Sequence, residues 1–167
     1  MKKIQVLIVE DKLDEAAFIK DLLVSNDYEV ASIAHSKEQA LRILREQLID
    51  IIIIDIYLDA QPNGLKLAEK IRKEGNLALP FIFICGSQDR DIFERAKVSC
   101  PNSFLLKPYN EIELLYAIEL SIQNYYTEML NKKDQNCLLF YVMRNFIRLD
   151  NIVQSSESTK MTHVYIN

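Results

Sequence analysis

The chain has 167 residues, of which 49% are hydrophobic and 26% charged, with 20 Lys and Arg against 24 Asp and Glu. This composition is typical of a globular protein with a buried core, and the length suits one domain of ordinary size with a smaller additional segment. Three glycines are too few for the glycine-rich phosphate loops of nucleotide-binding proteins, and the net charge of −4 gives no basic footprint for nucleic acid.

Short apolar runs alternate with helical patterns along residues 1–125. Buried strands are predicted for the runs rich in β-branched and aromatic residues, at 4–9, 28–34, 51–54, 81–84 and 103–106. After each of these runs, apolar residues recur at helical spacing, over 16–23, 36–48, 65–71, 92–96 and 110–122. The pattern therefore predicts five successive strand–helix pairs.

Two of the predicted helices begin with a capping box, in which a short polar residue and a Glu or Gln three residues later exchange hydrogen bonds. Ser36 and Gln39 form the pattern before the second helix, and Asn110 and Glu113 form it before the fifth. The helix that follows Ser36 is expected to reach Leu48 and to turn that side chain inward.

Five strand–helix pairs predict an α/β fold, because helical crossovers join parallel strands into a sheet that is covered on both faces. We therefore expect a (βα)5 fold, a doubly wound parallel five-stranded sheet. In such open sheets the ligand site gathers at the carboxyl ends of the strands. The residues that follow the strands are therefore the candidates for function.

Charged side chains follow three of the predicted strands. Glu10 and Asp11 follow the first strand. Asp55 ends the third, and Lys107 follows the fifth. Clustered carboxylates repel one another unless a cation lies between them, and Mg²⁺ accepts such hard oxygen ligands. Since a lysine offers a point charge to a phosphoryl oxygen, a carboxylate beside both groups is suited to accept a phosphoryl group.

Each of these residues also has a purely structural explanation. Adjacent acids such as Glu10 and Asp11 often begin a helix, since carboxylates favour its N-terminus. Asp55 ends a run of four isoleucines, where an acid without a function is unexpected. Lys107 alone carries little weight, but the four residues together at the strand ends favour a functional site.

Residues 1–125 resemble the receiver domain of two-component response regulators. The motifs that carry the resemblance are Val6–Asp11, Ile52–Asp55, Gly64, Pro80 before the fourth strand, and Leu105–Pro108. Their order, spacing and predicted secondary structure all agree with that family. The resemblance implies a flavodoxin-like fold with strand order 2-1-3-4-5.

The same resemblance implies a role for each residue of the site. Asp55 is then the phosphoacceptor, which receives its phosphoryl group from a sensor histidine kinase, and Lys107 contacts that group. Asp11 binds Mg²⁺ directly, Glu10 binds it through water, and the backbone carbonyl of Tyr57 is a further ligand beside Asp55.

Three departures from the family pattern stand out. Cys85 stands where the fourth strand usually ends in Thr or Ser; a thiol is the weaker donor, and a small buried filler is its structural explanation. Asp59 replaces a proline, and the loop from Asp55 to Gly64 is one residue longer than the commonest form. Phe104, at the position of the switch aromatic, replaces tyrosine and keeps the ring without the hydroxyl.

Residues beyond the receiver-like region form a second segment. Positions 126–137 are interpreted as the end of the last helix and a linker, and 138–167 as a short β-rich extension. Within it, 152–157 and 162–165 are similar to the opening of a LytTR-type DNA-binding domain, although the chain is too short for a whole one. The alternative is a tail with no function of its own. DNA binding is expected only with a complete C-terminal domain.

These features predict a response regulator receiver that accepts a phosphoryl group on Asp55 and controls transcription through altered self-association, as a homodimer. It is expected to be a phosphoacceptor with slow self-dephosphorylation rather than an enzyme. The alternative is a stand-alone or pseudo-receiver interaction module, in which Cys85 weakens phosphate sensing. An aspartyl phosphatase is disfavoured, because its Asp-x-Asp motif needs an acid where Tyr57 stands.

The cysteines and the apolar stretches indicate a cytoplasmic location. Cys85, Cys100 and Cys137 are odd in number and widely spaced, which argues against a disulfide framework or a zinc site. The apolar run at 4–9 is too short for a signal peptide, and the run at 49–58 is too short to span a bilayer. No membrane partner is expected.

Overall fold

The computed structural model describes residues 3–73 and 79–131. Within them, Lys3–Thr127 forms one compact unit. A second unit includes the residues from Glu128 onward, and of these the structure describes only the end of the last helix. The predicted extension at 138–167, with its resemblance to a LytTR-type domain, lies outside the described residues. It therefore stays a prediction, together with the linker that precedes it.

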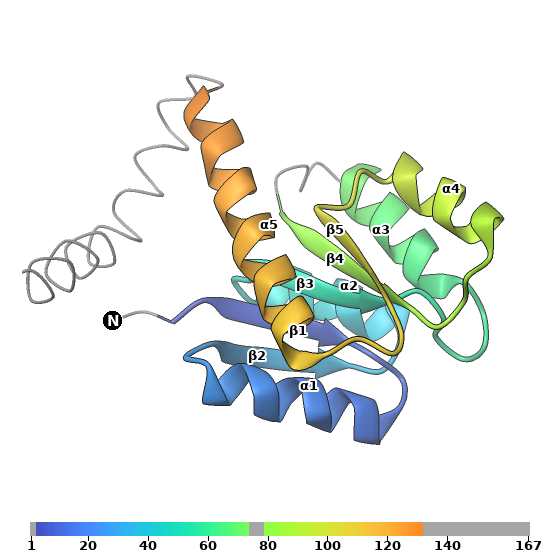
Figure 1. Ribbon diagram of the computed structural model, residues 1–167, viewed down its shortest axis with the longest axis horizontal. Coiled ribbons are helices and arrows are strands. Elements are labelled where there is room, and N and C mark those ends of the chain that lie inside the picture. Colours follow the sequence, from blue (N-terminus) through green and yellow to red (C-terminus); the bar gives the residue numbers. More distant parts are fainter. Residues whose placement is uncertain (1–2, 74–78, 132–167) are drawn as a thin grey trace, which may run out of the picture. The chain divides into compact units, whose positions relative to one another are not determined.

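Five parallel strands form one sheet in the order β2-β1-β3-β4-β5 (Figure 1). The strands are β1 (Gln5–Val9), β2 (Glu29–Ala34), β3 (Ile51–Asp55), β4 (Phe81–Cys85) and β5 (Ser103–Leu106). The helices are α1 (Leu13–Ser25), α2 (Lys37–Glu46), α3 (Asn63–Lys73), α4 (Arg90–Val98) and α5 (Glu111–Asn131). The doubly wound fold and the strand order that the sequence predicts are confirmed.

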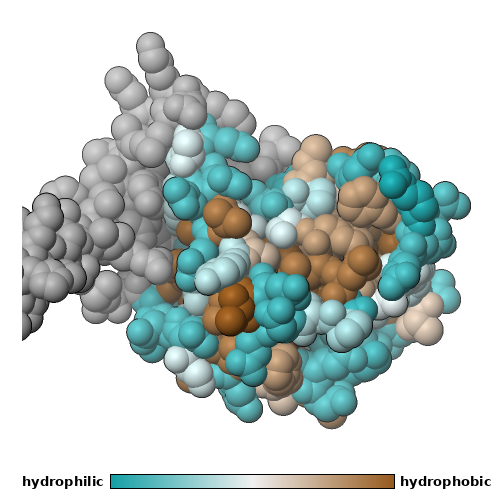
Figure 2. All heavy atoms as spheres, in the orientation of Figure 1, coloured by the Kyte–Doolittle hydropathy of each residue, from teal (hydrophilic) through white to brown (hydrophobic). Residues whose placement is uncertain are grey.

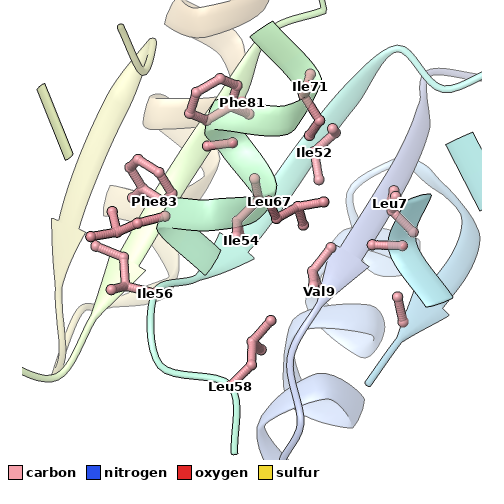
Figure 3. Packing of buried hydrophobic residues seen from close by; sticks show 14 of the residues in the cluster. Leu7, Val9, Ile52, Ile54, Ile56, Leu58, Leu67, Ile71, Phe81 and Phe83 are labelled. Carbon is pink, nitrogen blue, oxygen red and sulfur yellow. The ribbon is translucent and has the colours of Figure 1, made fainter. Parts of the chain in front are cut away.

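Alternating side chains along the strands build two cores, one on each face of the sheet. In β3, Ile52 and Ile54 point into the core beneath α2, α3 and α4, part of which is shown in Figure 3. Ile51 and Ile53 point into the core beneath α1 and α5. Because a strand covered on both faces has no solvent side, it needs the continuous apolar run that β3 has.

The strand registers bring the carboxyl ends of the central strands to one edge of the sheet. Val9 is paired with Ile54, and Cys85 is paired with Leu106. The residues that follow β1 and β5 therefore lie at the same edge as Asp55, the last residue of β3. This edge is where the sequence places the candidate site.

α2 begins as predicted and ends earlier. The Ser36 hydroxyl accepts a hydrogen bond from the backbone N–H of Gln39 at 3.2 Å. Gln47 has an extended backbone, with φ of −128° and ψ of 149°, which ends the helix and turns the chain toward β3. Leu48 is consequently 66% exposed, so the expectation that it faces inward is wrong, and Ile49 is the buried residue of this turn.

α5 begins with the predicted capping box. The Asn110 side chain accepts from the Glu113 N–H, and the Glu113 carboxylate accepts from the Asn110 N–H, both at 2.9 Å. The helix packs on the sheet through one apolar face, formed by Leu114, Ala117, Ile118 and Ile122.

None of the helices in the described part of the chain combines the length and the apolar character that crossing a membrane requires.

Candidate functional site

Lys107 is the centre of a charged cluster at the carboxyl edge of the sheet. Its ammonium donates hydrogen bonds to Asp55 Oδ2 at 2.5 Å, to Glu10 Oε2 at 3.0 Å, and to a carboxylate oxygen of Glu15. Glu10 is only 1% exposed and Asp55 only 5% exposed. Two nearly buried acids and a third acid on α1 therefore share this lysine.

Alternation along the strands places these groups on one face of the sheet. Ile53, two residues before Asp55, and Leu105, two residues before Lys107, both pack in or against the core beneath α1 and α5. Since side chains of a strand repeat with a period of two, Asp55 and Lys107 emerge at the end of that same face, beside α1. The backbone of the parallel strands thus sets the geometry of the cluster.

Backbone amides orient the two buried acids. The Tyr57 N–H donates to Asp55 Oδ1 at 2.8 Å, and the Lys12 N–H donates to Glu10 Oε1 at 3.1 Å. Each acid therefore has one oxygen on a backbone amide and the other on the Lys107 ammonium. Such paired bonds restrict both carboxylates to one orientation.

Crowding and burial shift the pKa values of the cluster. Burial, and then the neighbouring charge of Asp55, raises the pKa of Glu10 from 4.5 to about 7. Burial disfavours the charged form of Lys107, but its hydrogen bonds to Asp55 and Glu15 outweigh this effect and raise the Lys107 pKa. Burial also acts to raise the pKa of Glu15, but its bonds to Lys107 and Lys12 lower it. The acids therefore outnumber the cations that stabilise them.

These acids are suited to a divalent cation. Glu10, Glu15 and Asp55 each offer one carboxylate oxygen, and these oxygens lie within 4.8 Å of one another. Asp11, which the sequence predicts as a direct ligand, is outside that group. Its Oδ1 atom is buried and has no hydrogen-bond partner among the described residues. A buried carboxylate oxygen without a partner, next to surplus acids, fits the hard oxygen coordination of Mg²⁺.

The loop after β3 holds the other oxygen of Asp11. Leu58 and Gln61 exchange backbone hydrogen bonds of 3.0 and 3.1 Å around a two-residue turn. Asp59 and Ala60 form that turn with φ values of 54° and 55°, and the Asp59 N–H donates to Asp11 Oδ2 at 2.9 Å. A proline at the position of Asp59 has neither this φ nor an N–H. The absent proline and the longer loop thus belong to one tight turn that anchors Asp11.

Gly64 allows the start of α3 to approach the end of β3. Its N–H donates to the Ile56 carbonyl at 3.0 Å. A Cβ atom at this position would lie 2.1 Å from the carbonyl oxygen of Asp55 and 2.8 Å from the Cα atom of Ile56. Both neighbours are backbone atoms, which cannot rotate away. The close approach to Asp55 therefore requires glycine here.

Cys85 lies on the opposite face of the sheet from the side chains of Asp55 and Lys107. It is fully buried in the core beneath α2, α3 and α4. Its sulfur accepts a hydrogen bond from the Ser87 N–H at 3.4 Å. Burial raises the pKa of the thiol, and the charges of Asp55 and Lys107 affect it less. The thiol is therefore held by the backbone of its own loop.

Phe104 packs at the outer side of the same core. Its ring meets the rings of Phe83 and Phe93 edge to face, with centroids 6.4 and 5.2 Å apart. The half-buried ring also lines a surface hollow of about 650 Å³, together with Leu106 and Pro108. Figure 2 shows the apolar surface of this region between α4 and α5. Phe104 thus connects the core near Cys85 with an exposed surface.

Glu15 is the member of the cluster that the sequence left unrecognised. It lies in the first turn of α1 together with Asp14. Acids at the start of a helix are explained by its dipole, so their presence alone does not indicate a site. The available signal was a further acid close in sequence to Glu10 and Asp11, in the first turn of the helix that follows the first strand.

The sequence model of the response regulator receiver domain matches residues 6–119. The chain belongs to this family. It is 35% identical over 107 residues to the transcriptional regulatory protein MalR of Bacillus subtilis, an alignment that covers 64% of this chain and 45% of MalR. It is 28% identical over 119 residues to a probable chemotaxis protein CheY of Rhizobium etli, covering 71% of this chain and 92% of that protein.

Solved receiver domains share the fold. The signal receiver domain of a modulated diguanylate cyclase from Desulfovibrio desulfuricans G20 superposes with a TM-score of 0.69 at 35% identity, over 76% of this chain and 99% of that one. The chain spans about half the length of several curated relatives that it matches, which include MalR and the aerobic respiration control protein ArcA of Escherichia coli.

Proposed function

We propose that Asp55 is a phosphoacceptor that receives its phosphoryl group from the histidine of a sensor kinase. The observation that carries the proposal is the Lys107 ammonium, which contacts both Asp55 and Glu10 where three strands end. A nearly buried carboxylate, a fixed cation and surplus acids for a metal are the groups that phosphoryl transfer to a carboxylate needs. Membership of the receiver family supports the same conclusion.

The ionised Asp55 carboxylate is a nucleophile that has no proton to lose. One carboxylate oxygen forms a bond to phosphorus, while the bond between phosphorus and the donor nitrogen breaks and its electron pair stays with the imidazole. In the phosphorylated protein, Lys107 would donate N–H groups to the oxygens of the transferred group. The Tyr57 N–H holds the carboxylate during the attack. The acyl phosphate then hydrolyses slowly, so the protein acts as a phosphoacceptor rather than an enzyme.

Mg²⁺ is the proposed cofactor of this site. Asp11 would bind it directly and Glu10 through water, with Asp55 and the Tyr57 backbone carbonyl as further ligands. The buried Oδ1 of Asp11 supports this assignment, because it lacks a hydrogen-bond partner among the described residues. When bound, the ion supplies positive charge that offsets the charge of the phosphoryl oxygens.

The proposed output is a change of self-association, in which phosphorylation favours a homodimer and thereby controls transcription. Phe104 supports this output, because it lines the hollow between α4 and α5 and its movement would reshape that surface (Figure 2). This chain resembles MalR, which is named a transcriptional regulatory protein, and ArcA, which is named an aerobic respiration control protein. DNA binding would need a complete C-terminal domain, and a cytoplasmic location would suit these partners.

Cys85 favours a second candidate, a pseudo-receiver interaction module with weak phosphate coupling. Its thiol is the weaker donor and is already bonded within its own loop. A hydrogen bond to a charged group contributes roughly 1.5–3 kcal/mol, and a thiol supplies only part of it. If the thiol falls short of a hydroxyl by ~1.4 kcal/mol, phosphorylation would shift the equilibrium between the inactive and the active state about tenfold less. Sedimentation of the wild type and of Cys85→Thr, each with and without beryllofluoride, separates the candidates. Dimer formation by the wild type favours the receiver, and dimer formation by Cys85→Thr alone favours the module.

Labelling of the protein tests the phosphoacceptor directly. After incubation with acetyl phosphate and Mg²⁺, the intact mass of the wild type should increase by one phosphoryl group, and that of Asp55→Asn should not. Asp21→Asn, which removes an exposed carboxylate from α1, is the matched control and should be labelled normally. Labelling of Asp55→Asn to the extent of the wild type would show that another residue is the acceptor.

A further inference from the structure

Glu15 binds two lysines at the entrance to the site. One carboxylate oxygen accepts from the Lys107 ammonium, and the other accepts from the Lys12 ammonium at 2.7 Å. The side chain is 29% exposed, whereas that of Glu10 is 1% exposed. Glu15 is therefore the acid on the solvent side of the cluster.

The contacts of Lys107 leave no donor for a phosphoryl oxygen. An ammonium has three N–H donors, and three carboxylates, those of Glu10, Glu15 and Asp55, accept from it. A phosphoryl group can bind Lys107 only after one of these acids has released it. Glu10 is buried and held by the Lys12 N–H, and Asp55 is the acceptor itself. Glu15, with solvent beside it and no backbone bond to its carboxylate among the described contacts, is the acid free to leave.

We propose that Glu15 is a positioning residue that occupies an N–H donor of Lys107 needed by the incoming phosphoryl group and so restrains phosphorylation of Asp55. This inference rests on the proposed function of the site. In the reaction with an acyl phosphate, an Asp55 oxygen forms the new bond to phosphorus, and the bond from phosphorus to the acyl oxygen breaks to release the carboxylate. The donor arrives as an anion, so the Glu15 charge also repels it.

Neutralising Glu15 should therefore accelerate labelling. Glu15→Gln keeps the shape of the side chain and removes its charge, which frees Lys107 and Lys12 for the donor. The second-order rate constant with acetyl phosphate should rise about tenfold, through a lower KM for the donor rather than a higher maximal rate. The gain should shrink as salt is added, because salt screens the charges of exposed groups.

Two matched variants separate the contact from the charge. Asp14→Asn removes an exposed acid from the same helical turn and should leave the rate within a factor of about two. Glu15→Asp keeps the charge on a shorter side chain, so it should weaken the bond to Lys107 and give a rate between those of the wild type and Glu15→Gln.

Beryllofluoride and Mg²⁺ titrations provide readouts that do not depend on turnover. Glu15→Gln should bind beryllofluoride more tightly, with Mg²⁺ affinity within a few-fold of the wild type. If the wild type is labelled and Glu15→Gln is labelled at the same rate or more slowly, the inference about Glu15 is overturned and the proposed function stands. A tenfold loss of Mg²⁺ affinity would also overturn the inference, by making Glu15 a metal ligand. If no protein, the wild type included, is labelled on Asp55, the proposed function fails and this inference fails with it.

Discussion

The interior of β3 and its carboxyl end are built in opposite ways, although they are adjacent in the chain. From Ile51 to Ile54 every side chain is apolar, buried and packed in one of the two cores. The next residue, Asp55, shares a lysine with two other acids, and the turn that follows holds two residues with positive φ. The difference indicates that the strand interior supplies stability, and that the carboxyl end gives some of it up to keep charges close together.

The largest effect is expected in the interior. Ile53→Ala removes a fully buried side chain from the core beneath α1 and α5, and should lower the free energy of unfolding by about 4 kcal/mol. Ile112→Ala, on the exposed face of α5, is the matched control and should change it by less than about 1 kcal/mol. Urea denaturation measures both. Equal losses would mean that burial in the core beneath α1 and α5 does not carry the stability assigned to it.

Gly64→Ala should have the next largest effect, because it forces a Cβ atom against the backbone of Asp55. We expect a loss of about 3 kcal/mol, since the backbone of β3 or α3 must shift to relieve the overlap. Gly86→Ala offers the comparison at the same edge of the sheet, because a Cβ atom there has no neighbour within 4 Å. Similar thermal melts for the two variants would argue against the close approach.

Neutralising an acid at the site should instead stabilise the fold. The pKa of Glu10 is about 7 in the folded protein and 4.5 ordinarily, so the folded state holds the proton more tightly than the unfolded state. Stability therefore falls as the pH rises from 4.5 to 7, and the full deficit remains above pH 7. Glu10→Gln should remove this deficit and gain roughly 3 kcal/mol at pH 8 over the wild type, but little at pH 4.5.

Denaturation curves of the metal-free protein at pH 4.5, 6, 7 and 8 measure this prediction. Glu119→Gln, at an exposed position of α5, is the control and should show no such growth with pH. A gain for Glu10→Gln that is constant across these pH values would disprove the role of the Glu10 proton.

The turn after β3 should give the smallest change. Ala60 has a φ of 55°, which glycine adopts without the steric penalty of a Cβ atom. Ala60→Gly should therefore stabilise the fold by up to about 1 kcal/mol. Ala17→Gly, at an exposed position within α1, is the comparison and should destabilise the fold by about the same amount. Two losses of equal size would indicate that the turn is unstrained.

The fold and three of the four members of the charged cluster follow from patterns in the sequence. Four consecutive isoleucines predict the buried strand that ends in Asp55, because such a run suits a strand covered on both faces. Asp55, Glu10 and Lys107 come together because the ends of parallel strands meet at one edge.

Other features depend on where elements end and how helices are rotated, which local patterns determine poorly. Glu15 reaches Lys107 because α1 begins at Leu13, earlier than the apolar spacing indicates. Leu48 is exposed because Gln47 ends α2, although the apolar spacing continues beyond it. The turn that anchors Asp11 depends on backbone φ values that a sequence without glycine there does not suggest.

The melting temperature of Asp55→Asn without metal is the most direct test of the view that the site reduces stability. Asp55 is nearly buried among acids, so the neutral side chain should relieve repulsion and raise Tm in EDTA. Added Mg²⁺ should raise the Tm of the wild type and raise that of the variant much less. A variant that melts below the wild type in EDTA, with an undiminished response to Mg²⁺, would contradict the account.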